Sequence, residues 1–211
     1  MMNRDVASGA LLIAGAAAGV VVMGLHPTAH GLMSAESGRH LTQLNVLVHG
    51  LALAAVPMVF LGLLGLCRRL GPSDLATAGL VAYGWGCVAV MSAAVASGFV
   101  APEVIARLAS EGGATMPESL LAYTGLWNKE FAKVNVVATS VAIVLFSATM
   151  LRRGRLSRAA GAFGAVAGGV ISILFFAGHL TLDLHGFRFV TFAQSAWLVW
   201  VGALLCRVNR V

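Results

Sequence analysis

Six apolar runs, each about as long as a bilayer is thick, constrain this chain more than any other feature. A helix needs about 20 apolar residues to cross the hydrocarbon core, and in lipid its backbone polar groups must be satisfied internally. We therefore expect an all-α fold, a polytopic membrane protein built as a six-transmembrane-helix bundle in a single domain, 1–211. The runs lie at roughly 8–26, 44–66, 77–100, 131–151, 159–180 and 187–206.

The composition agrees with a membrane protein. Of the 211 residues, 59% are hydrophobic and 10% charged, whereas soluble domains carry about 25% charged residues. The net charge of +6 comes from arginines in short loops, where membrane topology explains them, so we expect the lipid bilayer and no nucleic acid as partner. A homo-oligomer is left open.

The loop charges predict the orientation. The N-terminus, the loops at 67–76 and 152–158 and the C-terminus share one side, with nine basic and two acidic residues. The opposite side has five basic and six acidic residues. Cytoplasmic loops are rich in Lys and Arg, which predicts an N-in/C-in protein of the bacterial cytoplasmic (inner) membrane, with both termini cytoplasmic.

The long outer loop, 101–130, has a helical pattern of its own. Pro102 is suited to the first turn of a helix, and Thr115 with Glu118 resembles a capping box that opens a second one. We expect two short interfacial helices resting on the membrane surface.

A weak internal repeat relates residues 44–100 to residues 131–180. In each, a span that begins near an Asn-Val pair is followed by a basic turn and another span. The repeat predicts a four-helix core to which the first and last spans are added.

All the histidines fall on the predicted outer side. An ionisable residue at membrane depth is a functional-site hypothesis by default, and His49 lies inside the second span. His26 and His30 have HxxxH spacing, which suits a metal if they share one side, although solvated loop histidines are the simpler alternative. His40 is expected at the surface. The set comprises His26, His30, His40, His49, His179 and His185.

The stretch from Gly178 to Gly186 alternates polar residues with leucines between the last two spans. In an extended segment the polar side chains share one face, whereas in a continued helix His179 and Asp183 become i,i+4 neighbours. Either geometry brings an imidazole close to a carboxylate, although a solvated hairpin is the simpler alternative. We expect this loop to lie against the outer ends of the first two spans.

Two polar stripes begin at the outer ends of the second and fourth spans. Facing each other they would form an outward-opening polar crevice, because polar groups that face lipid cost free energy. Interhelical hydrogen bonds without any ligand are the alternative. The stripes are Thr42, Asn45 and His49, and Asn128, Asn135 and Thr139.

The first functional hypothesis is an outward-facing site for a metal ion (zinc, copper or iron) or for a b-type haem. The metal ligands would be His26, His30, His49, His179, Asp183 and His185. A haem would lie between His49 and His179, with Asn45 and Asn135 beside the cofactor. A metal-dependent membrane hydrolase or a redox protein would follow, with Asp183 and Glu130 as catalytic groups. An ion pair of Glu130 with Lys133 is the simpler alternative.

Two further classes stay open. Titratable side chains along a polar crevice also suit a small-solute or proton transporter. A structural or accessory membrane protein without ligand fits the sequence as well. The chain has no P-loop, GxSxG, HExxH or CxxC motif, which argues against soluble nucleotide chemistry.

Overall fold

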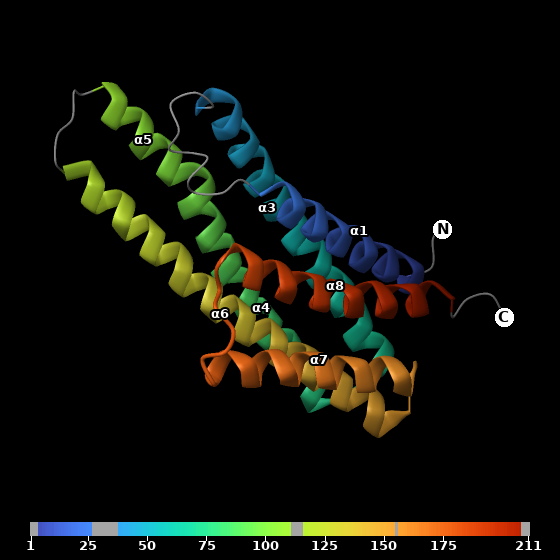
Figure 1. The fold of residues 1–211 in the computed structure, drawn as a ribbon. Helices are drawn as coiled ribbons and strands as arrows, with labels where there is room; N and C mark the ends of the chain where they lie inside the picture. The colour runs from blue at the N-terminus through green and yellow to red at the C-terminus, as the bar shows by residue number, and fades with distance from the viewer. Residues whose placement is uncertain (1–3, 27–37, 111–115, 155, 208–211) are drawn as a thin grey trace.

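The structure, a computed structural model, describes residues 4–26, 38–110, 116–154 and 156–207, and these residues contain helices and no strand. The helices pack side by side as one bundle (Figure 1). In chain order they are α1 (Arg4–Leu25), α3 (Gly38–Leu70), α4 (Asp74–Val95), the π-helical turn η1 (Ala96–Val100), α5 (Ala101–Ser110), α6 (Met116–Arg153), α7 (Arg158–Phe176) and α8 (Leu184–Arg207).

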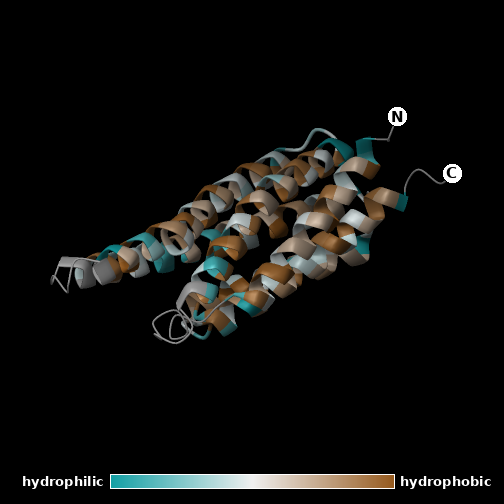
Figure 2. Ribbon diagram, turned by 90° about the horizontal axis from the view of Figure 1, so that it is seen from above, coloured by the Kyte–Doolittle hydropathy of each residue, from teal (hydrophilic) through white to brown (hydrophobic). Residues whose placement is uncertain are grey.

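Six of the described helices are long and apolar enough to cross a membrane, which confirms the predicted number of spans. Apolar colours cover most of each helix in Figure 2, and hydrophilic residues mark the ends beside the termini. The spans are Arg4–Leu25, His40–Leu70, Asp74–Arg107, Ser119–Arg153, Arg158–Phe176 and Leu184–Arg207.

The two ends of the bundle differ in the residues and connections that they contain, and we name each end for its main feature. The basic end holds both described chain ends and the turns after α3 and α6, with Arg68, Arg69, Arg152 and Arg153 in the last turns of those helices. The opposite end, which we call the loop end, holds the connection from α7 to α8.

The main hydrophobic core lies toward the basic end. Leu12, Leu63, Phe146 and Trp197 come from four different helices and are fully buried in one cluster. Helix backbones approach closely here: a Cβ added to Gly9 of α1 would lie 2.5 Å from the Gly202 carbonyl oxygen of α8. Small residues permit such contacts, which replace the hydrophobic effect as the attraction between helices in lipid.

Three helical segments extend beyond the others at the loop end. At 1.5 Å per residue, the 38 residues of α6 span about 57 Å, whereas the hydrocarbon core is about 30 Å thick. The helix formed by α4, η1 and α5 and the 33-residue helix α3 are also longer than the core. Figure 1 shows these segments projecting past α1, α7 and α8.

The predicted interfacial helices are not confirmed. Residues 101–110 continue α4 through η1, residues from Met116 onward belong to α6, and Thr115 lies outside the described residues. The π turn explains why Pro102 does not begin a new helix. It shifts the hydrogen bonding so that Ala101 N–H reaches the Ala96 carbonyl, and such local adjustments make proline tolerable within a membrane helix.

Candidate functional site

A cavity of about 780 Å³ opens among α1, α3, α4, α6 and the segment that leads into α8. Its volume falls in the range of small-molecule sites, which are mostly apolar with a few placed polar groups. Aliphatic and aromatic side chains such as Val22, Val90 and Phe175 form much of its wall. Its polar lining residues are His26, His49, Asn128, Lys129, Lys133, Thr181 and Asp183.

Two imidazoles from different helices meet at this cavity. The rings of His26 and His49 lie with centroids 5.0 Å apart in a T-shaped contact. His49 Nδ1 lies 2.8 Å from the Asn45 carbonyl oxygen, and since a carbonyl only accepts, Nδ1 carries the proton. Nε2 is then the nitrogen that can accept a hydrogen bond or bind a metal.

Gly98 of the π turn gives His49 its place. A Cβ at Gly98 would lie 2.6 Å from His49 Cγ, so any larger residue would displace the imidazole. Directly beside it, Asn45 Nδ2 donates to the Ser97 carbonyl over 2.9 Å. The π turn therefore sets the depth at which His49 is held against α4.

The two polar stripes meet only in part. Asn135 Nδ2 donates to the Gly86 carbonyl over 2.9 Å, so the asparagines of α3 and α6 both bind the backbone of the third span. Interhelical hydrogen bonds without a ligand, the alternative to a polar crevice, therefore explain both asparagines. Of the stripe residues, His49 and Asn128 line the cavity, whereas Asn45, Asn135 and Thr139 do not.

Sequence reasoning missed a polar connection from α6 to α8. Gln194 Nε2 donates to Thr139 Oγ1 over 3.0 Å and to Ser140 Oγ over 3.1 Å. Thr139 in turn donates to the Asn135 carbonyl over 2.7 Å. A lone glutamine at the centre of the last apolar run was the signal for this connection.

The segment between α7 and α8 is extended and not helical. Helix α7 ends at Phe176, and Gly178, just beyond it, has a φ of 75°, which suits glycine. In the segment that follows, polar residues and leucines alternate. Leu180 and Leu182 pack against buried residues, whereas Thr181 is exposed. Asp183 Oδ1 accepts the Gly186 N–H over 2.8 Å and so caps the start of α8.

At the loop end the start of α8 lies against the first span, whereas the prediction named the outer ends of the first two spans. Arg188 Nε donates to the Met23 carbonyl over 2.8 Å and so ties the start of α8 to the end of α1. Thr181 and Asp183 line the same cavity as His26 and His49. Residues from the N-terminal and the C-terminal parts of the sequence therefore meet at one site.

The structure assembles only part of the predicted metal set. His26, His49 and Asp183 line the cavity, whereas His179 and His185 are exposed and outside its lining. The predicted haem pair, His49 with His179, is therefore not brought together. His30 lies outside the described residues, among which no group of three or more His, Cys, Asp or Glu side chains could hold a metal ion.

Glu130 lies apart from the cavity lining. Its carboxylate accepts from Lys133 Nζ over 2.6 Å on the same helix, and 59% of its side chain is exposed. Lys129 and Lys133 do line the cavity. Sequence reasoning had considered Lys133 only as an ion-pair partner of Glu130 and Lys129 only as a charge of the predicted outer side. Lys129 and Lys133 are four residues apart, so on a helix they share one face with the cavity-lining Ala132. That spacing was the signal available in the sequence.

Fold and site together define the class: an integral membrane protein, a six-helix bundle with a mostly apolar cavity that carries some polar groups at its loop end. A comparison with protein-family models, curated proteins and solved structures finds no match to this chain. Its function is therefore argued from its own residues.

Proposed function

We propose that this protein binds a small amphiphilic solute in the loop-end cavity, as a carrier for that solute. The observation that carries the proposal is the cavity itself, with apolar walls and the His26–His49 pair among its polar groups. A site of this composition suits a molecule with an apolar body and a compact polar head. The imidazoles would bind the head.

The packing supports a carrier open on one side. The cavity lies at the loop end, while Leu63, Phe146, Met150 and Trp197 fill the bundle toward the basic end. Carriers bind their solute near the middle of the membrane and expose the site to one side at a time. In such a cycle the described structure would be the state open toward the loop end.

The proposed orientation places the loop end outside the cell. Arginines concentrate at the basic end, as they do on the cytoplasmic side of membrane proteins. Both termini would be cytoplasmic, in a bacterial cytoplasmic membrane, and the projecting ends of α5 and α6 would stand in the outer headgroup layer. The solute would then be taken up from outside.

Thermal unfolding of the purified protein tests solute binding. Single-chain amphiphiles with carboxylate, phosphate or carbonyl heads are added one at a time, and a ligand that binds only the folded state raises the unfolding temperature. We expect at least one to do so for the native chain and to lose its effect with His49→Ala. The control is His40→Ala, an exposed histidine of the same helix. A panel without any effect on the native chain contradicts the proposal.

A transition metal at the His26–His49 pair is the second candidate. The ring contact brings two imidazoles within reach of one ion, and Asp183 lines the same cavity. An ion with open coordination positions would supply hydrolytic or redox chemistry. Titration with Cu²⁺, followed by electron paramagnetic resonance, should show one site per chain with nitrogen hyperfine coupling. His49→Ala should abolish this site and His40→Ala should keep it; a site that survives His49→Ala contradicts the assignment.

A further inference from the structure

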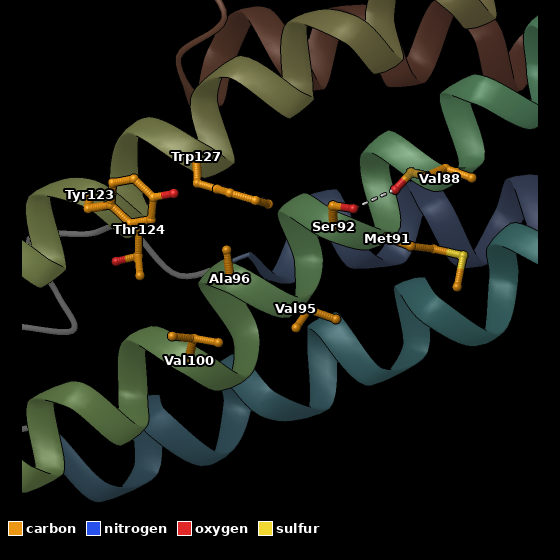
Figure 3. Close-up of a pocket in the computed structure, with 9 residues that line it drawn as sticks. All are labelled: Val88, Met91, Ser92, Val95, Ala96, Val100, Tyr123, Thr124 and Trp127. Carbon is orange, nitrogen blue, oxygen red and sulfur yellow. Dashed lines mark hydrogen bonds between the residues drawn. The ribbon is translucent and has the colours of Figure 1, made fainter.

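A second hollow lies on the outer surface of the bundle, on the other side of the helices that wall the cavity. It is an open groove of about 540 Å³ between α4–η1 and α6 (Figure 3). On α4 and η1 it runs from Val88 to Val100, which is about 18 Å of helix, or roughly the depth of one leaflet. Tyr123 and Trp127 of α6 lie along its other edge.

The walls of this groove suit a hydrocarbon chain. Val88, Met91 and Val95 are exposed apolar residues that line it. Its two small hydroxyl groups are both engaged within their own helices: Ser92 donates to the Val88 carbonyl and Thr124 to the Leu121 carbonyl, each over 2.9 Å. Neither hydroxyl has a proton left to bind a polar group in the groove.

Groove and cavity are separated by small side chains. Ser92 lines the groove and the next residue, Ala93, lines the cavity; on α6, Trp127 and Asn128 are divided in the same way. Ala93 is only 5% exposed, so the barrier on the α4 side is a buried alanine. The π turn η1, which begins three residues later, interrupts the regular helix at this level.

The cavity side of this barrier offers hydrogen-bond donors. Lys129, the amide of Asn128 and Lys133, whose Nζ also donates to Glu130, line it. His49 can donate from Nε2 only when its ring is protonated, because its Nδ1 already donates to the Asn45 carbonyl. The one carboxylate of the lining, Asp183, already caps helix α8. Two lysine ammonium groups against one lining carboxylate favour a head that accepts hydrogen bonds and carries negative charge.

We infer that the solute is a single-chain carboxylate amphiphile, with its hydrocarbon chain in the α4–α6 groove and its carboxylate in the cavity beside Lys129 and the His26–His49 pair. This inference rests on the proposed function. The molecule would enter sideways from the bilayer by parting α4 and α6 at Ala93. The chain would stay in an apolar medium throughout, whereas the head would have to cross the contact between α4 and α6.

Tryptophan quenching by a nitroxide-labelled stearic acid tests this placement. Trp127 and Trp200 are both 40% exposed, and Trp200 packs against Phe163 of α7, outside the groove. Two proteins are compared in lipid nanodiscs, one with Trp85→Phe and Trp200→Phe, the other with Trp85→Phe and Trp127→Phe. Both retain the buried Trp197 as a constant background.

We expect Trp127 to be quenched saturably, at about tenfold lower mole fraction of the probe than Trp200, a ratio equivalent to about 1.4 kcal/mol. Lys129→Gln or the methyl ester of the probe should remove most of this difference. Arg107→Gln, a charge of the same end that lies outside both linings, should keep it. Equal, unsaturable quenching of the two tryptophans overturns the inference.

The remaining outcomes separate this inference from the function on which it rests. If quenching of Trp127 is saturable but is unchanged by both Lys129→Gln and His49→Ala, the hydrocarbon chain lies in the groove while the head is not bound in the cavity. That result overturns the inference. If Trp127 shows no preference while an amphiphile still raises the unfolding temperature in a His49-dependent way, solute binding stands and sideways entry is wrong.

Discussion

The two ends of this bundle are packed differently although the same helices run through both. At the basic end the Gly9 and Gly202 backbones touch, and large side chains such as Trp197 are fully buried. At the loop end, Gly24 of α1 and Gly50 of α3 face open space, and a cavity and a groove flank α4. One end is built for stability, and the other leaves room for a ligand.

Residue type and helix length together produce this difference. Leucine, phenylalanine and tryptophan fill the basic end around glycines, whereas the cavity lining adds alanines, histidines and lysines to its large apolar side chains. Helices α3 and α6 also continue past α1, α7 and α8, so their outer turns have fewer neighbours. Where helices lack neighbours, a close-packed core cannot form.

The largest effect is expected from a methyl group added at the basic end. Gly9→Ala places a Cβ against the Gly202 carbonyl, and overpacking of this kind costs about 1–3 kcal/mol. Gly24→Ala, on the same helix, meets no atom within 4 Å and should be neutral or slightly stabilising. Thermal unfolding in detergent, followed by circular dichroism, measures both. Equal losses for the two variants would remove the distinction between the ends.

A smaller effect is expected from the asparagine at the π turn. Asn45→Ala removes the hydrogen bond to the Ser97 carbonyl, and such bonds in membrane bundles contribute about 0.6 kcal/mol on average and up to about 1.7. Gln43→Ala, an exposed neighbour on α3, is the control and should change nothing measurable. The same unfolding assay applies; an Asn45→Ala protein as stable as the native one would show that this contact does not hold α3 to η1.

The smallest change in stability is expected from the histidines, and it separates the functional classes. His179→Ala removes an exposed side chain and should alter stability by less than about 0.5 kcal/mol and leave ligand binding unchanged. His49→Ala should also leave the fold intact, while amphiphile binding is lost. If neither variant changes binding or phenotype, the protein is a structural component without ligand.

The spans could be predicted because hydropathy alone determines them. Each of the six apolar runs became one helix, although the bounds differ: the fourth span begins at Ser119 and not near 131, and the fifth ends at Phe176 and not near 180. The alternation from Gly178 to Gly186 also had a readable consequence, because Leu180 and Leu182 pack against buried residues while Thr181, Asp183 and His185 are exposed. The spans and this alternation both follow from residues that are close in the sequence and from the apolar environment of the lipid.

The rest depended on contacts between distant residues. The sequence could not show that Asn45 and Asn135 would both bind the backbone of the third span. Nor could it show that η1 would let Pro102 continue a helix that was expected to begin there. The meeting of His26 with His49 follows from the packing of α1 on α3, whereas the exposure of His179 follows from the place where α7 ends.

Cysteine labelling tests most directly whether an open cavity exists at the loop end. In a protein with Cys67, Cys87 and Cys206 replaced by alanine, Ala52→Cys lies in the cavity lining and Ala142→Cys is fully buried on α6. A water-soluble maleimide, added to folded protein in nanodiscs, should modify Ala52→Cys and leave Ala142→Cys unmodified until the protein is denatured. Two cysteines that are equally unreactive in the folded protein would contradict the cavity and the function proposed for it.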